Sequence, residues 1–393
     1  MRRELFGGIA LESVWADLGL SEASVSSFFQ FGTLDLSQLD GGVAVSEPSS
    51  EFALTRAYSG VAALRGQAAA TFVSLHNPNT APVTLRLSLA SESGASPAGV
   101  SPAPVEMTIS GLGVVQQSLA QIFGQDIAGG YVKGEVTSGD GIFAFQVIQM
   151  TAQSTVFGLG PQEVGFATTL YSAQLASAPG LFTNVNLINL SDSTRQLTLT
   201  ALDENGANLV DPVSLTLSPG EQYSQDAGQL FAAPATTPQT TAPATFVGSL
   251  KVDADGPGVV GDVVFGGSDN LDFAAALALQ SQTFTEAVFS QVANVPGFFT
   301  GLAFFNPGPG AADLVVEVYA ADGTLVGSET LNLPAGQRRS ALVDEFVPAS
   351  AGQAGGYVII RTNVGLIAQM LFGATSPDGS IKLFSAVPPT VIL

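Results

Sequence analysis

Apolar and polar residues alternate along several short segments of this chain. In residues 196–202 (Gln-Leu-Thr-Leu-Thr-Ala-Leu) most apolar side chains fall on every second position, and the next four residues, Asp-Glu-Asn-Gly, favour a turn. Residues 313–319 alternate in part and are followed by an Asp-Gly pair at 322–323 and a return segment at 326–333. A period of two with such a turn is typical of antiparallel hairpins. These segments therefore predict short antiparallel β-strands.

Long segments with the helical period are missing from the sequence. The best helical candidate is a single turn at residues 118–123. Turn residues recur about every 8 to 12 positions, the spacing expected of β-sandwiches with about seven short strands. We predict an all-β fold.

The sequence contains internal repeats. Residues 72–78, 184–190 and 301–307 align with one another, and each stretch has an asparagine near its end. Two further anchors follow in the same order in every copy, one leading to a phenylalanine and one opening with a glycine. Three ordered anchors that recur three times indicate a repeat architecture. The anchor residues are Asn77, Asn189 and Asn306, then Phe123, Phe231 and Phe346, then Gly130, Gly248 and Gly356.

The anchors divide the chain into three complete repeats and one partial repeat. We predict β-sandwich repeats at residues 61–175, 176–290 and 291–393. Residues 1–60 match only the second half of a repeat, because residues 5–11 align with the phenylalanine anchor and the glycine step that follows it. Either the chain begins inside a domain or strands from another molecule complete the partial repeat.

A partial sandwich would expose unpaired strand edges, which invite strand addition from a neighbour. The C-terminal segment, residues 385–393 (Ser-Ala-Val-Pro-Pro-Thr-Val-Ile-Leu), ends in β-branched residues and is a candidate donor strand. We therefore expect a string of sandwiches that associates end to end with copies of itself.

The second repeat is longer than the others in one loop. Residues 232–247 are rich in Ala, Pro and Thr, a composition that supplies no core and favours extended backbone. We expect this loop to protrude, either as a tolerated insertion or as a loop that bears a glycan or contacts a partner.

Charge narrows the range of partners. The 393 residues include 12 Lys and Arg against 33 Asp and Glu, a net charge of −21, and only 11% of the residues are charged. Proteins bind nucleic acid and anionic membranes through cationic contacts to phosphate. Because this chain has so few Lys and Arg residues, neither partner is expected. No apolar run reaches the ~18 residues of a membrane helix, so no membrane insertion is expected. The low charge also predicts apolar surface that is buried between domains or subunits.

Composition also limits the chemistry. The chain has no cysteine, which removes disulfides, thiolate nucleophiles and the common zinc sites. Its single histidine, His76, stands where the other copies have Ile188 and Phe305, so a structural role is favoured over catalysis. Glycosidases need only two carboxylates, but the repeats differ in their acidic positions and offer no common pair. We predict that the protein is not an enzyme and has no catalytic residue.

One acidic segment has the composition of a cation site. Asp253 and Asp255 lie in the sequence Asp-Ala-Asp-Gly, and Asp262 follows downstream. Calcium prefers such clustered carboxylates, although the EF-hand spacing is absent and an ordinary acidic turn is the favoured alternative. Asp253, Asp255 and Asp262 are therefore candidate calcium ligands, and no other cofactor is expected.

Lys133 and Lys251 occupy the same place in two copies. Some bacterial surface sandwiches carry a Lys-to-Asn isopeptide crosslink, but the third copy has Ile359 at this position. Alternation places Lys133 with Tyr131 and Glu135 on the wetter face of their strand. A solvated ion pair is the favoured interpretation.

The turns and core residues carry a resemblance. With the Asn-Pro-Gly step at 306–308, the Leu-x-Pro-x-Gly-like turn at 333–336 and the Gly-Tyr-Val strand at 356–358, the chain resembles tandem immunoglobulin-like β-sandwich repeats of secreted bacterial surface, stalk and filament proteins. The resemblance covers nearly the full length and implies an extracellular scaffold, adhesin or fibre subunit. It carries no functional residue, because turn and core residues support a fold and not an activity.

These observations lead to two functional hypotheses. The first is a non-enzymatic extracellular structural protein, a self-associating filament, stalk or surface-layer subunit whose partial repeat a neighbouring subunit completes. The alternative is an adhesin, a repeat array that binds a cell-surface carbohydrate or protein through the loops at the ends of its sandwiches. Because carboxylates dominate the charge, we expect stronger association as the pH falls.

Overall fold

The computed structural model describes residues 29–32, 39–42, 48–90, 103–150, 155–232, 245–267 and 271–392. Within them the chain is all-β, and its helices are single turns. The alternating segments at 196–202 and 313–319 are β-strands, as predicted. Two sequence predictions lie outside the described residues: the alignment of residues 5–11 with half a repeat, and the protrusion of the loop at 233–244.

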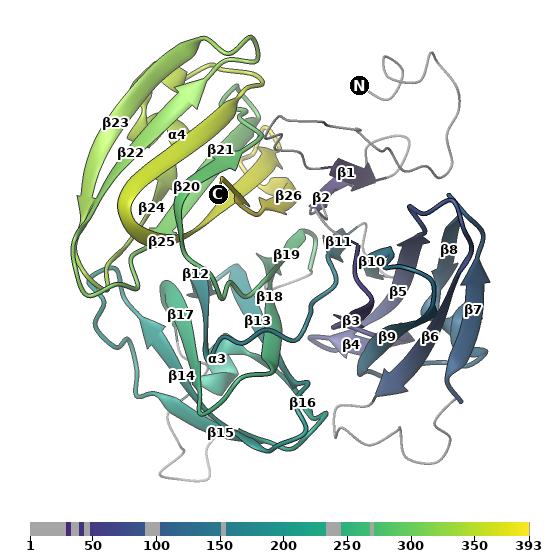
Figure 1. Ribbon diagram of the computed structural model, residues 1–393. Coiled ribbons are helices and arrows are strands. Elements are labelled where there is room, and N and C mark those ends of the chain that lie inside the picture. Colours follow the sequence, from purple (N-terminus) through teal and green to yellow (C-terminus); the bar gives the residue numbers. More distant parts are fainter. Residues whose placement is uncertain are drawn as a thin grey trace.

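The first sandwich has two facing antiparallel sheets (Figure 1). One sheet has the order β3-β9-β6-β7. In the other, β10 lies between β11 and β5, and both β4 and β8 pair with β5. The bounds are β3 Glu51–Leu54, β4 Ser59–Leu64, β5 Gln67–His76, β6 Val83–Ala90, β7 Val105–Ile109, β8 Val114–Ser118, α2 Leu119–Phe123, β9 Tyr131–Ser138, β10 Phe143–Met150 and β11 Val156–Leu159.

The second sandwich has the same strand order, with sheets β12-β17-β14-β15 and β16-β13-β18-β19. Its core combines both sheets and the turn α3. The bounds are β12 Thr169–Ser177, β13 Leu181–Asn189, β14 Arg195–Leu202, β15 Val213–Leu217, β16 Gln222–Asp226, α3 Ala227–Leu230, β17 Phe246–Ala254, β18 Val259–Gly267 and β19 Ala274–Ala278.

The third sandwich merges two strands into one. Strand β25 pairs first with β20 and β22 and then with β21 and β26, so it runs through both sheets. The other sandwiches turn at this point through Gly-rich segments, whereas residues 362–365 have a single glycine. The bounds are β20 Phe284–Phe289, β21 Phe298–Phe305, β22 Ala312–Tyr319, β23 Leu325–Leu333, β24 Arg338–Leu342, α4 Val343–Phe346, η1 Pro348–Ser350, β25 Tyr357–Thr375, β26 Ile381–Val387 and β27 Thr390–Val391.

The asparagine anchor is a buried clamp. In each copy its side-chain amide donates hydrogen bonds to three backbone carbonyls of two loops, at 2.8–3.2 Å. Buried polar groups are almost always hydrogen-bonded, and here one side-chain amide satisfies three backbone carbonyls that have left the strand ladders. The repeated motif therefore marks a loop junction at the same place in each sandwich.

The glycine anchor marks a close backbone approach. A Cβ atom on Gly248 would lie 2.0 Å from the carbonyl oxygen of Leu202, and one on Gly356 would lie 2.1 Å from that of Tyr319. Gly356 also has a φ of +111°, which favours glycine. The phenylalanine anchors lie in or beside the helical turns and are buried in the cores. The predicted turn at 118–123 is confirmed by α2, which Ser118 caps.

Each sandwich begins before its first sequence anchor. Strand β3 pairs with β9 and so belongs to the first sandwich. In the same way β12 pairs with β17 in the second sandwich, and β20 pairs with β25 in the third. They start N-terminal to residues 61, 176 and 291, where the anchors placed the boundaries. The first strand escaped the alignment because its sequence differs among the copies.

The C-terminal segment does not act as a free donor strand in this structure, contrary to the sequence prediction. Strand β26 pairs with β25, and β27 pairs with β20 of the same sandwich. The β-branched residues at the end of the chain therefore complete the third sandwich.

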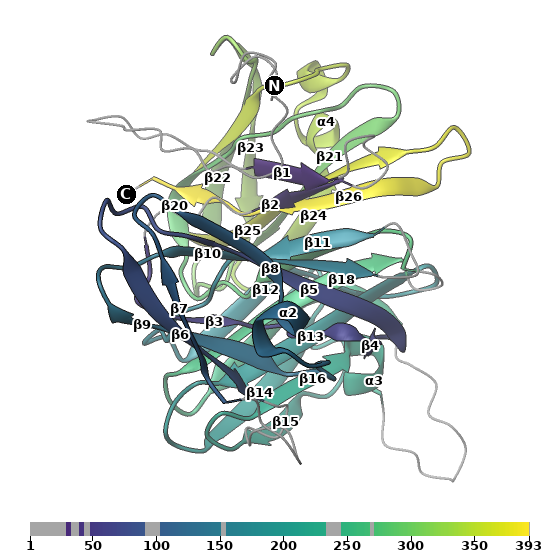
Figure 2. The ribbon, with the colours of Figure 1, turned by 90° about the vertical axis from the view of Figure 1, so that its right-hand side faces the viewer.

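The sandwiches do not form an extended string, so this expectation was wrong. They pack around a common centre, where the last strands β11, β19 and β26 meet (Figure 1). An N-terminal hairpin of β1 (Phe29–Gly32) and β2 (Leu39–Gly42) reaches the same centre, and β2 contacts both β26 and β11 (Figure 2). Apolar clusters lie between neighbouring sandwiches in this packing, as the low charge of the chain predicted.

Candidate functional site: the interfaces between sandwiches

We call the sheet that contains β3, β12 or β20 the first sheet of its sandwich and the other sheet the second sheet. The residues that follow β3 in the first sandwich contact the second sandwich. They lie on the outer face of its second sheet, which contains β13, β16 and β18. An apolar cluster forms this contact, and both sandwiches contribute to it. Its members are Tyr58, Leu64, Ala69, Ile148, Met150, Phe157 and Leu159 with Phe182, Val264, Leu271, Ala274 and Ala276.

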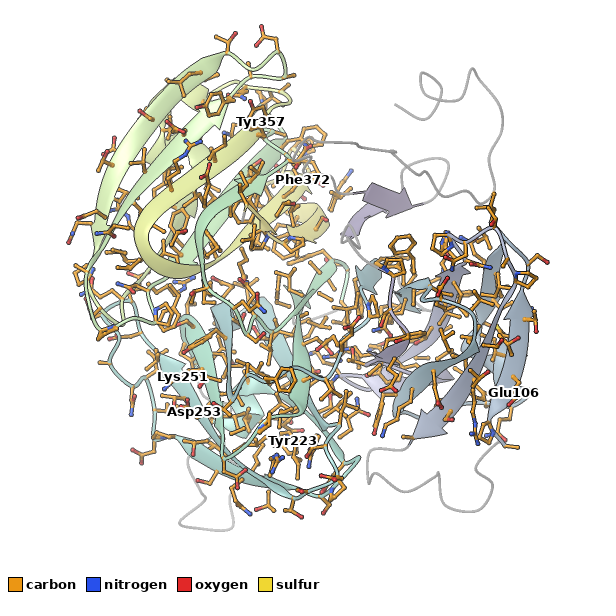
Figure 3. All side chains as sticks on the ribbon, in the orientation of Figure 1. Glu106, Tyr223, Lys251, Asp253, Tyr357 and Phe372 are labelled. Carbon is orange, nitrogen blue, oxygen red and sulfur yellow. The ribbon has the colours of Figure 1, made fainter. Side chains whose placement is uncertain are left out.

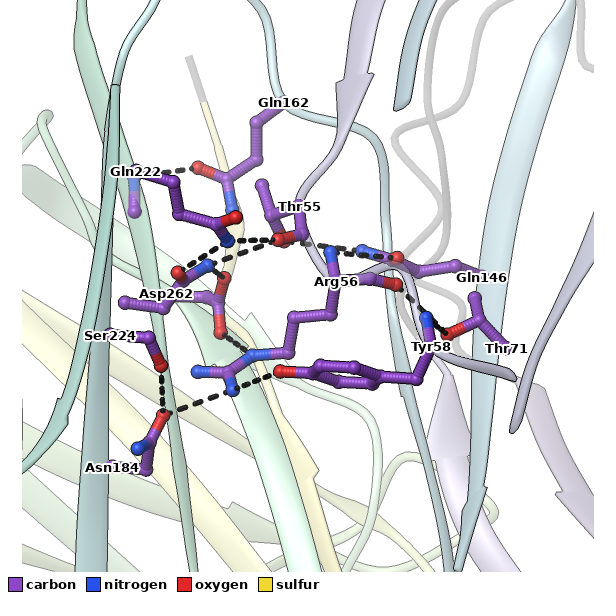
Figure 4. Close-up of polar contacts among 12 residues, drawn as sticks. Thr55, Arg56, Tyr58, Thr71, Gln146, Gln162, Asn184, Gln222, Ser224 and Asp262 are labelled. Atoms are coloured by element: carbon purple, nitrogen blue, oxygen red, sulfur yellow. Dashed lines mark hydrogen bonds and ion pairs between the residues drawn. The ribbon is translucent and has the colours of Figure 1, made fainter. Parts of the chain in front are cut away.

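A fully buried ion pair lies in this interface (Figure 4). The Nε of Arg56 donates to Oδ1 of Asp262 on β18 at 2.5 Å, and both side chains are 0% exposed. Nη1 of Arg56 donates to Oδ1 of Asn184 at 3.0 Å. Asn186 donates to the second carboxylate oxygen of Asp262 at 2.7 Å. Both charged groups therefore have fixed polar partners in place of water, and Nη2 of Arg56 is the one guanidinium nitrogen with no hydrogen-bond partner in the described part of the chain.

The backbone joins this network. The carbonyl of Thr55 accepts from Nε2 of Gln222 on β16 at 2.9 Å, and the same amide donates to Asn186 at 2.7 Å. Burial by itself lowers the pKa of Arg56, but the attraction of Asp262 and its hydrogen bond outweigh burial and raise it. The guanidinium is therefore charged at every physiological pH, and the carboxylate neutralises it.

The interface between the second and third sandwiches uses another arginine. Nε of Arg338 on β24 donates to the carbonyl of Ala173 at 2.7 Å, and Nη2 bonds to Gln174. Its nearest carboxylate, on Glu204, is 3.7 Å away and exposed. Burial lowers the pKa of Arg338 to about 10, and the attraction of Glu204 opposes this shift only in part.

The two interfaces have the same plan. The carbonyl of Thr55, directly after β3, accepts from Gln222 at the first position of β16, and the carbonyl of Ala173, at the bulge within β12, accepts from Arg338 at the first position of β24. Behind that contact Asp262 on β18 corresponds to Gln369 on β25, because Asn186 and Ala303 are their partners in register. The first and second sandwiches thus each present a backbone carbonyl in or just after the first strand to the outer second-sheet face of the next sandwich.

A tyrosine that the sequence placed on the wetter face also belongs to the first interface. Lys133 and Glu135 are exposed as expected, but Tyr131 is buried. Its hydroxyl donates to the carbonyl of Gly220 in the second sandwich at 2.9 Å. Burial raises the pKa of Tyr131 to about 12. Alternation found the face correctly and could not show that a neighbouring sandwich covers part of it.

The structure separates the three candidate calcium ligands. Asp262 is the buried partner of Arg56 on the second sheet, whereas Asp253 lies on the first sheet. Asp253 pairs with Nζ of Lys251 at 2.8 Å, side by side in Figure 3, and also accepts from Thr169. Asp255 is exposed. In the described part of the chain no three His, Cys, Asp or Glu side chains gather as a metal site.

The single histidine lies on the outer face of the second sheet of the first sandwich. Nε2 of His76 is 2.7 Å from Oγ of Ser74, and burial lowers the pKa of His76. The equivalent face of each later sandwich is covered by its predecessor, so this position belongs to a packing surface. A structural role for His76 stays a prediction.

Sequence reasoning missed both buried arginines. The available signal was a charged residue inside an apolar segment: Arg56 follows Phe52-Ala-Leu-Thr, and Asp262 interrupts the run from Val259 to Phe265. In a chain with 12 cationic residues such a placement is informative, because charges are rarely buried without a partner. The sequence could not show which acid meets which arginine.

The comparisons with known proteins give no family. No family model matches the chain, and no curated protein matches it. Among solved structures, a β-glucuronidase from glycoside hydrolase family 2 is similar at 10% identity and a TM-score of 0.15, over 81% of this chain and 30% of that one. This likeness is too slight to bear on fold or activity. Among the described residues, no helix is long and apolar enough to span a bilayer.

Proposed function

We propose that the protein is a non-enzymatic structural subunit of an extracellular surface or filament assembly, built from immunoglobulin-like sandwiches fixed into one rigid block. The observation that carries the proposal is the buried Arg56–Asp262 pair between two sandwiches. Because its two side chains come from different sandwiches, this pair fixes the position of one sandwich relative to the next.

The energetics of such a pair favour a rigid joint. Removing two charges from water costs several kcal/mol per ion, and only well-placed partners offset that cost. Sliding or opening the interface would separate Arg56 from Asp262, Asn184 and the apolar cluster around it. Domains in one chain move relative to one another by default unless a large apolar interface holds them together. A rigid block suits a load-bearing or lattice-forming role.

We take three exposed apolar residues of the third sandwich as candidate contacts with other copies. Phe298, Leu325 and Leu342 are large side chains with open surface on β21, β23 and the end of β24. Large apolar side chains in the open are typical of interaction surfaces when they lie close together. The net charge of −21 opposes association at neutral pH and less so in acid.

Multi-angle light scattering over a concentration series, with negative-stain microscopy of the same samples, tests the proposal. We expect the mass to rise with concentration, more steeply at lower pH, and ordered particles on the grid. Leu325→Glu should weaken association, whereas Ser328→Glu, which adds the same charge to β23, should weaken it less. A monomer at every concentration and pH would contradict self-assembly.

One observation favours the second candidate, a binding array that acts through loops. Phe166 is 96% exposed in the segment between β11 and β12, and Val164 beside it is also exposed. An open aromatic ring on a loop is a common contact for a sugar or a protein. Saturable binding of the full chain on a glycan array, lost in Phe166→Ser and kept in Ser328→Glu, would favour this role.

A further inference from the structure

The first sheet of each sandwich has one face toward its own core and the other face outward. Because the strands of the three first sheets correspond in register, these outward faces can be compared position by position. Figure 1 shows β22 and β23 at the rim of the molecule, away from the other two sandwiches. We call the outward face of β20, β22, β23 and the first part of β25 the rim face.

One central position of the rim face is apolar where the other sandwiches have a charge. The position lies three residues after the glycine anchor, and it holds Lys133 in the first sandwich and Lys251 in the second. The third sandwich has Ile359 there, half-buried, between the buried residues Val358 and Ile360 that point into the core. Since the same sandwich folds with a lysine at this position, its core does not require the isoleucine.

A neighbouring position differs in the same direction. Val315 on β22 is half-buried on the rim face. Its counterparts by register are Arg86 on β6 and Thr198 on β14, and both of them are exposed. Two neighbouring positions of an outward face are thus apolar only in the third sandwich. Apolar side chains gathered on an outward face are typical of an interaction surface.

An aromatic pair lies at one end of the rim face, where Figure 3 labels Tyr357. Tyr319 and Tyr357 are partners in register, and their rings stack with centroids 5.1 Å apart. Leu325, which pairs with Tyr319 from β23, is 49% exposed. The counterpart of Tyr357 in the first sandwich is Tyr131, which is buried and bonds to the second sandwich. The rim face therefore continues a surface that already forms an interface in another copy of the repeat.

A guanidinium group lies on the other side of Ile359. Along this face of β25 the order is Tyr357, Ile359, Arg361. Arg361 is exposed and forms ion pairs with Glu286, at 3.0 Å, and with Glu317. Guanidinium groups stack favourably on aromatic rings. The rim face thus carries both members of such a contact, at equal distances along the strand from Ile359.

We propose that the rim face binds the rim face of a second copy of this chain. A two-fold axis through Ile359 lays Tyr357 of each copy over Arg361 of the other and brings the two isoleucines together. The face is self-complementary in this arrangement, and an interface that uses the same patch on both copies closes as a dimer.

The size of the rim face sets the expected affinity. With neighbouring strands about 4.8 Å apart and successive side chains of one face about 7 Å apart, its four strands present an area of about 20 Å by 20 Å. An area of this size is at the low end for a specific interface. We therefore expect a dissociation constant in about the micromolar range.

Light scattering of the full chain over a concentration series tests the proposal with a residue that the repeat itself uses. Ile359→Lys places the lysine of the other two sandwiches at the centre of the rim face, so folding should be kept, and urea denaturation checks this. The dissociation constant should rise at least about 100-fold, because two like charges would be buried at the two-fold axis. Thr198→Lys adds the same charge to the outward face of the second sandwich and should change the constant less than about twofold.

Crosslinking locates the contact, because the chain has no cysteine of its own. Ser328→Cys places one thiol on β23 in the same row as Ile359, since Glu317 pairs with both. Packed sheets lie about 10 Å apart, so a bismaleimide of about that span should join two copies. Ser214→Cys, on the exposed edge strand β15 of the second sandwich, should give no crosslinked dimer. Equal crosslinking of the two variants, or crosslinking of Ser328→Cys that survives the addition of Ile359→Lys, would overturn the proposal.

The inference rests on the proposed function in treating the protein as self-associating, and the outcomes are separable. A dimer that Ile359→Lys abolishes, with no larger particle at any concentration or pH, would keep the rim face and remove the surface or filament assembly. Assembly of Ile359→Lys equal to that of wild type would keep the assembly and overturn the rim face. A wild-type chain that stays monomeric would overturn both and leave the rim face to a different partner.

Discussion

The two interfaces between sandwiches share a backbone contact and differ in charge. At the first, Arg56 enters from one sandwich and meets the buried carboxylate of Asp262 in the next. At the second, Arg338 belongs to the receiving sandwich and bonds to the neutral groups of Ala173 and Gln174, with only an exposed acid nearby. The shared plan fixes where sandwiches meet, and the side chains decide how strongly and with which neighbour.

The difference shows how a shared backbone contact can be combined with side chains that distinguish one partner face from another. The segment that carries Arg56 lies against a face with the buried carboxylate of Asp262, whereas the segment that carries Gln174 lies against a face with Gln369 at that position. Discrimination comes from the cost of burying a charge without its partner, which excludes wrong pairings more than it favours the right one.

The largest expected effect comes from breaking the buried pair. Asp262→Asn keeps the shape and leaves Arg56 charged and buried, so the free energy of unfolding should fall by about 3–5 kcal/mol. Urea denaturation measures this loss. Asp255→Asn, on an exposed acid of the same sandwich, should change it by less than about 0.5 kcal/mol. Recovery of most of the loss in Arg56→Met/Asp262→Leu would show that the unpaired charge is the cause.

At the second interface, Arg338→Met should cost less, about 1–3 kcal/mol. It removes the donors to Ala173 and Gln174 but also removes a charge that burial disfavours. Glu204→Gln should have almost no effect, because that side chain is exposed. A loss as large as that of Asp262→Asn in the same urea titration would show that the interfaces are not different in the way described.

Alkaline pH should weaken the first interface through Tyr131. Its pKa is about 12 in the folded protein, above the ordinary value of 10, so the unfolded chain loses this proton first. The stabilisation is complete below pH 10 and is lost as the pH rises through 12, by about 1.4 kcal/mol at pH 11. Denaturation of wild type and Tyr131→Phe at pH 9 and 11 isolates this contribution. Equal pH slopes for the two proteins would contradict it.

The smallest effect is the loss of one hydrogen bond at pH 7. Tyr131→Phe keeps the ring in the interface and removes only the donor to the Gly220 carbonyl, which should cost about 0.5–1.5 kcal/mol. Chemical denaturation against wild type measures the difference. A cost well above this range would mean that the hydroxyl also orders the turn around Gly220.

The sequence predicted the sandwich well and the site poorly. Period-two alternation found β14, the Asp-Gly pair found the β22–β23 turn, and the asparagine and glycine anchors proved to be a buried clamp and a close backbone approach. These features depend on neighbours within one repeat. Asp262 was interpreted as a calcium ligand because its partner, Arg56, is 206 positions away in another sandwich. Alternation likewise placed Tyr131 on the same face as Lys133, but it could not show that the second sandwich covers Tyr131.

The sequence by itself determined the unit of this protein: turn glycines, clamp asparagines and alternating strands specify a small β-sandwich through contacts inside one repeat. Only the tertiary structure decided how the units meet. Which outer faces are covered, that Arg56 is neutralised by Asp262, and that β2 contacts both β26 and β11 all depend on the packing of whole sheets. The physical reason is that periodicity reports which face of a strand is apolar, but not what lies against it.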